Sequence, residues 1–286
     1  MLNTSMAYFA PTDLQEAVNT LRRFKAKAAV LAGGTDLMIA LQKENVKCEA
    51  LIDIGKIDDI RQITRSGNFL SVGAVVSFSS LIKSPLVRKW APLLAQAAAT
   101  VGSPQIRNRG TIGGNIATAS PAGDLLTPLV ASAAEIIVMG PGGKRRVLVD
   151  KLLNNRDGEQ LQRDEIICEI CIPVEDPLEI RSAFVKLGRR NALSISRLNL
   201  ALYLKMKDDS IVMSRLAVGA AAPVPFRVVE AEQALLVKEG FKAETVMQAV
   251  SRAVADALGD RPSAPYKVIA VKGLVWDALS QCGLVK

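Results

Sequence analysis

The sequence contains no histidine among its 286 residues. This absence excludes every catalytic triad and every zinc site that uses an imidazole, and it removes the commonest general base. We therefore expect no catalytic side chain and no metal site in this chain. Whatever chemistry it performs is expected to come from a cofactor.

Cysteine is also scarce, with four scattered residues at Cys48, Cys168, Cys171 and Cys282. Cys168 and Cys171 have the C-x-x-C spacing that is typical of metal and redox sites. Their context, "DEIICEICIP", indicates a β-strand, in which residues three apart point to opposite faces. Because no second pair exists, the sequence favours two plain strand cysteines over a metal site.

Aromatic residues make up only 4% of the chain, whereas the formal net charge is +8. Proteins that bind nucleic acid combine a basic stripe with aromatic platforms. The basic clusters Arg22–Arg23, Lys144–Arg146 and Arg189–Arg190 have no interleaved aromatic residues. We therefore expect no nucleic-acid partner. The clusters are either solvated surface or contacts to an acidic partner subunit or an anionic cofactor.

Long apolar runs are missing as well. No run reaches the roughly 18 residues that a membrane span needs. The N-terminus, "MLNTSMAYFAPTD", lacks the basic region and apolar core of a secretory signal. These absences predict a cytoplasmic protein with no membrane span.

The order of apolar patterns predicts an α+β fold in two domains, residues 1–176 and 177–286. Within the first domain, a β–loop–α–β order over about 1–57 and a change of pattern over 58–176 indicate two subdomains. In the second domain, strands come first and helices follow. This order is typical of an antiparallel sheet covered on one face.

Two helices of the first domain are predicted in detail. Apolar residues at helical spacing predict a helix over 12–24, with Thr12 and Gln15 in capping-box positions. A second stretch, over 86–101, predicts one long amphipathic helix.

The segment "LAGGTDL" (31–37) leaves a predicted strand, turns through Gly33 and Gly34, and begins a predicted helix. Thr35 or Asp36 can serve as its N-cap. A helix N-terminus preceded by glycines offers unpaired backbone N–H groups and a positive dipole end, which suit a phosphate. Glycine before a helix is also common in any α/β fold, so this loop alone does not decide between the two interpretations.

The segment "GTIGGNIATASPAGD" (110–124) is a second glycine-rich loop. Gly113 and Gly114 permit close approach to the backbone, Thr118 offers a hydroxyl, and Asp124 can accept hydrogen bonds from ligand hydroxyls such as those of a ribityl chain. The alternative is a tight glycine-rich turn that caps the next helix at Asp124.

The two loops together are more specific than either alone. Gly33 and Gly113 stand 80 residues apart, and two such loops can hold a pyrophosphate from both sides. Neither loop is a Rossmann G-x-G-x-x-G or a Walker A motif, which argues against the usual NAD fold and against an NTPase. The combination predicts a flavin dinucleotide held between two subdomains.

"LAGGTDL" together with "VGSPQIRNRGTIGGNIATASPAGD" resembles the FAD-binding subunit of the molybdenum hydroxylase (xanthine dehydrogenase) family, and is most similar to the bacterial xanthine and nicotinate dehydrogenase type. The segments "DEIICEICIP", "SAFVKLGRR" and "RPSAPYK" extend the resemblance over nearly the whole chain. It implies a two-subdomain FAD-binding domain of the vanillyl-alcohol-oxidase/MurB (PCMH) type. A C-terminal α+β domain of the CO dehydrogenase flavoprotein type would follow.

The resemblance also implies which residues hold the FAD. These are Val30, Leu31, Ala32, Gly33, Gly34, Thr35, Asp36, Leu37, Val101, Gly102, Thr111, Ile112, Gly113, Gly114, Asn115, Thr118, Asp124, Ile167 and Lys186.

Their implied roles differ. Residues 30–37 would wrap the pyrophosphate, chiefly through backbone N–H groups. Residues 111–115 would contact its other side and approach the isoalloxazine. Asp124 would bind sugar or ribityl hydroxyls, and Ile167 would contact the adenine. Lys186 would lie near the flavin ring, where a cation stabilises an anionic reduced flavin; the alternative is an exposed strand lysine.

The family implies an oxidoreductase built from several chains. Substrate would be hydroxylated on a molybdopterin-binding large subunit, electrons would pass through a [2Fe–2S] small subunit to FAD on this chain, and NAD+ or another acceptor would remove them. Two rivals remain: a stand-alone FAD-dependent oxidoreductase of the same superfold, and a scaffold subunit that has lost FAD.

Overall fold

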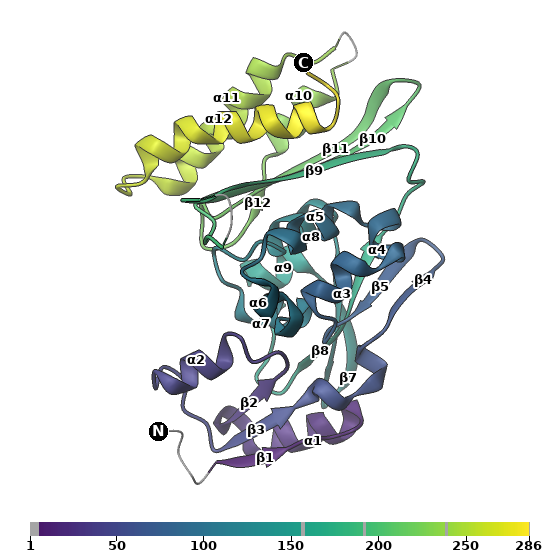
Figure 1. The fold of residues 1–286 in the computed structure, drawn as a ribbon, viewed down its shortest axis with the longest axis vertical. Helices are drawn as coiled ribbons and strands as arrows, with labels where there is room; N and C mark the ends of the chain where they lie inside the picture. Colours follow the sequence, from purple (N-terminus) through teal and green to yellow (C-terminus); the bar gives the residue numbers. More distant parts are fainter. Residues whose placement is uncertain (1–5, 156–157, 191–192, 238–239, 286) are drawn as a thin grey trace.

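In the part of the chain that the structure describes, three β-sheets follow one another and are stacked from the bottom to the top of Figure 1. A computed structural model describes residues 6–155, 158–190, 193–237 and 240–285.

The first sheet is parallel and has the order β1-β3-β2, with β1 at Ala7–Phe9, β2 at Ala28–Leu31 and β3 at Ala50–Asp53. Helix α1 (Leu14–Phe24) buries one apolar face against this sheet. Helix α2 (Leu37–Gln42) follows β2. Short 3₁₀ turns at Lys25–Lys27, Ile54–Lys56 and Asp58–Ile60 complete this part of the chain.

The predicted cap of α1 is wrong by one residue. Asp13, in extended backbone, accepts a hydrogen bond from the Glu16 N–H at 2.8 Å. Glu16 in turn accepts one from the Thr12 N–H at 3.4 Å. The cap therefore uses Asp13 and Glu16, not Thr12 and Gln15. It differs from a full capping box, because the return bond comes from the Thr12 N–H and not from the N–H of the cap residue Asp13.

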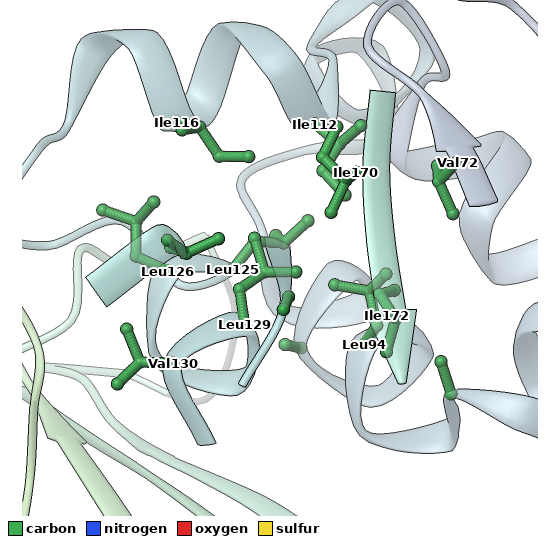
Figure 2. Close-up of a cluster of buried hydrophobic side chains, with 14 of the residues drawn as sticks. Val72, Leu94, Ile112, Ile116, Leu125, Leu126, Leu129, Val130, Ile170 and Ile172 are labelled. Carbon is green, nitrogen blue, oxygen red and sulfur yellow. The ribbon is translucent and has the colours of Figure 1, made fainter. Parts of the chain in front are cut away.

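The second sheet has five antiparallel strands in the order β4-β5-β8-β6-β7. Its strands are β4 (Ile63–Ser66), β5 (Phe69–Gly73), β6 (Glu135–Gly140), β7 (Gly143–Leu148) and β8 (Ile166–Pro173). Its helices are α3 (Phe78–Lys83), α4 (Pro85–Trp90), α5 (Pro92–Thr100), α6 (Pro104–Arg109), α7 (Ile112–Thr118), α8 (Leu126–Ala131) and α9 (Val149–Asn154). Leucine, isoleucine and valine side chains of α5, α7, α8 and β8 meet in the central core (Figure 2).

The single helix predicted over 86–101 is in fact two helices, α4 and α5. Ala91 separates them with φ −140° and ψ 56°. The ring of Pro92 disfavours a helical conformation in the residue before it, so the chain bends there although the apolar spacing continues.

The third sheet is antiparallel, in the order β12-β11-β10-β9. Its strands are β9 (Ile180–Leu187), β10 (Leu198–Lys207), β11 (Ser210–Gly219) and β12 (Phe226–Arg227). Helices α10 (Val229–Leu235), α11 (Ala243–Leu258) and α12 (Ala264–Gln281) cover one face (Figure 1). The other face contributes Ala201 and Tyr203 to the central core. The predicted α+β arrangement is confirmed.

Cys168 and Cys171 lie in β8 as buried free thiols, which confirms the strand interpretation. Over the described ranges, no three or more cysteine, aspartate or glutamate side chains gather in a way that suits a metal ion. In the same ranges, no helix combines the length and apolarity needed to cross a bilayer.

Candidate cofactor-binding site

A cavity of about 750 Å³ opens between the three sheets. Val30 of β2, Ile167 of β8 and Lys186 of β9 all line it, although they are far apart in the sequence. The volume falls in the range of roughly 300–1,000 Å³ that is common for small-molecule sites. Of the residues predicted to hold a cofactor, all but Leu31 and Ile112 line this one cavity.

Leu31 and Ile112 face the protein instead. The Ile112 side chain is completely buried in the central core, and its backbone N–H donates to the Val76 carbonyl at 3.1 Å. The Leu31 side chain does not line the cavity; a Cβ on Gly34 would lie 3.3 Å from its Cδ1. The resemblance implied the whole segments 30–37 and 111–115, and these two residues stand in them between neighbours that do line the cavity.

The first glycine loop presents free hydrogen-bond donors to the cavity. In the described chain, the backbone N–H groups of Gly33, Gly34, Thr35 and Asp36 donate to no protein acceptor. Gly34 has φ +76°, a left-handed conformation that L-residues other than glycine rarely adopt. Successive N–H groups in such a turn form a concave anion-binding nest.

Gly33 lacks a side chain for a reason that the sequence did not reveal. A Cβ at this position would lie 2.0 Å from the Arg109 carbonyl oxygen and 3.1 Å from the Gly110 Cα. The two glycine loops therefore touch each other here, and glycine permits that contact. Gly113 is similar, because its Cβ would lie 2.7 Å from the Ala74 carbonyl oxygen.

The second glycine loop is largely helical, not an open turn. Thr111 caps α7 by accepting from the Gly114 N–H at 3.1 Å, and the Gly113 N–H donates to the Ala74 carbonyl at 2.9 Å. These donors are already used, so this segment presents side chains to the cavity more than backbone N–H groups. Among them, the buried Oδ1 of Asn115 has no hydrogen-bond partner among the described residues.

Asp124 and Lys186 form an almost completely buried ion pair at the cavity wall. Their side chains are 7% and 10% exposed, and Lys186 Nζ lies 2.5 Å from Asp124 Oδ2. Nζ also donates to the Thr100 carbonyl at 3.0 Å. Two of the three donors of the ammonium group are thus used by the protein. This excludes an exposed strand lysine at position 186. It also excludes a capping role for Asp124, since no side chain caps α8.

Three residues that the sequence did not predict complete this polar cluster. Ser196 Oγ donates to Asp124 Oδ1 at 2.5 Å, and Asn199 Nδ2 lies 3.4 Å from the same oxygen. Thr127 Oγ1 donates to Asn199 Oδ1 at 2.6 Å. Thr127 lies in α8 and Asp124 just before it. Lys186 and Asn199 lie on β9 and β10 of the third sheet, and Ser196 lies in the connection between these two strands. We call these five residues the interdomain network.

The end of the cavity nearest the first sheet is mainly apolar, although the ionisable Glu165 also lines the cavity. Val30, Ile54, Leu161, Ile166 and Ile167 line it. Val30, Ile54 and Ile166 also belong to the small core beneath the first sheet. A flat, uncharged ring system is the kind of group that such a wall accommodates.

Taken together, these features fit FAD. The nest at Gly33–Asp36 suits a pyrophosphate, the unpartnered Asn115 Oδ1 suits a hydroxyl or N–H donor, and the apolar end suits a heteroaromatic ring.

A family model described as the FAD binding domain in molybdopterin dehydrogenase matches residues 4–175. The chain belongs to this family. A second model, the CO dehydrogenase flavoprotein C-terminal domain, matches residues 182–282. These matches confirm the resemblance and the fold class that the sequence predicted.

Relatives match along nearly the whole length of the FAD-binding chain. The nicotinate dehydrogenase FAD-subunit of Eubacterium barkeri is 34% identical, with 93% of this chain and 92% of the relative covered. The carbon monoxide dehydrogenase medium chain of Hydrogenophaga pseudoflava is 32% identical, with 98% of each covered. A solved structure of carbon monoxide dehydrogenase from the same organism has a TM-score of 0.89 at 32% identity, covering 99% of both chains. These relatives are dehydrogenase subunits.

Proposed function

We propose that this chain is the FAD-carrying electron-transfer subunit of a multi-subunit molybdenum hydroxylase. Its partners would be a molybdopterin-binding large subunit and a [2Fe–2S] small subunit, which delivers the electrons. NAD+ or another acceptor would remove them. One observation carries this proposal. The N–H groups of Gly33–Asp36, which have no acceptor among the described residues, belong to a loop that lines a cavity large enough for a dinucleotide, in a chain of this family.

The residues that would hold the cofactor divide into three groups. The backbone of Gly33, Gly34 and Thr35 would bind the pyrophosphate. Asn115, with Asp124 and Lys186 of the interdomain network, would face the ribityl chain and the flavin ring. Ile167 and its apolar neighbours would receive the adenosine. Val101, Gly102 and Thr118, which line the same cavity, complete the proposed site.

When bound, FAD supplies the exchange between one-electron and two-electron chemistry. The protein groups have other tasks. The nest neutralises phosphate charge, and the apolar end excludes water. Lys186 supplies its third ammonium donor, while Asp124 balances its charge. The site of Lys186 is therefore close to neutral overall, which is less electropositive than a lone lysine would be.

The visible absorbance spectrum of the purified chain tests the proposal. It is recorded as isolated, then after addition of FAD and removal of the excess. We expect a flavin spectrum that remains after the excess FAD is removed and that NADH bleaches only slowly.

Two other results would contradict this assignment. Rapid substrate turnover by the isolated chain would identify a stand-alone oxidoreductase. No retained flavin, even after reconstitution with the neighbouring subunits, would identify a scaffold that has lost its cofactor.

A further inference from the structure

Arg145, on β7, holds the segment that leads into β8. Its Nε and Nη2 donate to the two carboxylate oxygens of Glu165, each at 2.7 Å. Nη2 also donates to the Gln160 carbonyl at 3.0 Å, and both Nη atoms lie 3.3 Å from the Glu159 carbonyl. Two parallel bonds to one carboxylate need the planar fork of arginine. We call these contacts the Arg145 clasp.

The clasp is charged, and its carboxylate is shielded from water. The Glu165 side chain is 10% exposed, whereas the Arg145 side chain is 33% exposed. Burial raises the pKa of this carboxyl, but hydrogen bonds from Arg145 and from the Gln162 N–H lower it more, so that the pKa lies below its ordinary value. Gly140 leaves room for the pair, because a Cβ there would lie 3.0 Å from Glu165 Cγ.

The clasp fixes part of the apolar end of the cavity. Leu161 lines the cavity and packs against the central core. Its two neighbours are both held: the Gln160 carbonyl by Arg145, and the Gln162 N–H by Glu165 at 2.8 Å. Leu161 therefore stands on a segment whose position the clasp determines. Arg145 does not line the cavity, so it acts through Leu161 and Glu165.

We propose that the Arg145 clasp positions the wall that receives the nucleotide half of FAD, and so sets the preference of the site for a flavin dinucleotide over FMN. This inference rests on the proposed FAD site. FMN carries the flavin ring and ribityl phosphate but no adenosine, whereas ADP carries the adenosine and pyrophosphate but no flavin. The two compounds therefore report separately on the two ends of the cavity.

The test measures equilibrium binding of FAD, ADP and FMN to the full chain after bound flavin has been removed. In Arg145→Met, we expect the Kd for FAD and for ADP to rise by the same factor, about tenfold or more, since a charge-assisted contact is lost at that end only. The Kd for FMN is expected to stay unchanged.

Arg146 provides the matched control. It is the next residue of the same strand and pairs with Glu135 at 2.7 Å, and neither residue lines the cavity. Arg146→Met should leave all three dissociation constants unchanged. Arg145→Lys keeps the charge but not the fork, so it should recover only part of the ADP affinity.

A pH profile gives a readout that a general loss of stability does not imitate. A carboxyl whose pKa is lowered in the folded protein stabilises that state at pH values above its ordinary pKa. This stabilisation is lost as the pH falls through the lowered pKa. The ADP affinity of the unsubstituted chain should therefore fall in acid below the ordinary glutamate range, near 4.3. In Arg145→Met this step should be missing.

Two results would overturn the inference alone: unchanged ADP affinity in Arg145→Met, or an equal loss of FMN and ADP affinity. If Arg145→Met does not fold, the same three dissociation constants are measured for Glu165→Gln. This substitution removes the charge of the carboxylate with almost no change in side-chain volume. An unsubstituted chain that binds none of the three compounds would overturn the proposed function, and this inference with it.

Discussion

The interdomain network allows a prediction whose magnitude follows from burial. Lys186→Met removes the ammonium group and leaves the Asp124 carboxylate 7% exposed. Of the residues that the structure describes, only Ser196 and Asn199 then donate side-chain hydrogen bonds to it. Removing one partner of a buried ion pair costs about 3–5 kcal/mol, because the remaining charge is left desolvated. We expect that loss in the free energy of unfolding, measured by urea titration of the flavin-free chain.

The chain contains a matched control for this experiment. Lys27 and Glu49 form an ion pair at 2.7 Å, but their side chains are 67% and 61% exposed. Water already solvates both charges, so Lys27→Met should cost only about 0.2–1 kcal/mol. The two substitutions delete the same ammonium group from ion pairs with similar N–O distances. The two ion pairs differ in how deeply they are buried.

The double variant Asp124→Asn with Lys186→Met completes the design. Asparagine still accepts from Ser196 but carries no charge, so more than half of the lost stability should return. If Lys186→Met costs no more than Lys27→Met, or if the double variant recovers nothing, the reasoning about the buried pair is wrong.

Three further predictions concern glycines and thiols. Gly33→Ala should abolish FAD retention while far-UV circular dichroism stays unchanged, because its Cβ would lie 2.0 Å from the Arg109 carbonyl oxygen and force the loops apart; normal flavin content would contradict the loop contact. Gly114→Val should also prevent flavin retention without unfolding the chain, since Gly114 faces the cavity, and a normal absorbance spectrum would exclude this segment from the site. Burial raises the pKa of Cys282 to about 12, so alkylation of the native chain at pH 8, followed by mass spectrometry, should label the less buried Cys48 first; equal labelling would contradict the burial of Cys282.

Local patterns predicted most of the secondary structure. The helix at Leu14–Phe24 and the strand that holds Cys168 were both evident from the spacing of apolar residues. The break before Pro92 was missed because the apolar pattern continues across it, although the proline itself was a signal. Residues 112–118 were expected to be a loop because glycine disfavours helix; packing of Gly113 against Ala74 outweighs that preference.

The sequence indicated which residues line the site, but it did not indicate the contacts that these residues make. Glycines at two separate loops indicated a dinucleotide, but no local pattern showed that Gly33 contacts Arg109 rather than a ligand. Ser196 and Asn199 lie 72 and 75 residues from Asp124 in the sequence. Their roles depend on how the third sheet packs onto the helices, and a single sequence carries no signal of such a contact.

The interdomain network also limits how this protein can be recombined. A gene fusion that joins the first 176 residues to the C-terminal domain of another flavoprotein would keep both glycine loops. It would lose Lys186, Ser196 and Asn199, and would leave a buried carboxylate at Asp124 without its cation. The unit that can be exchanged between subunits of this kind is therefore the whole chain, or a C-terminal domain that brings the same three side chains with it.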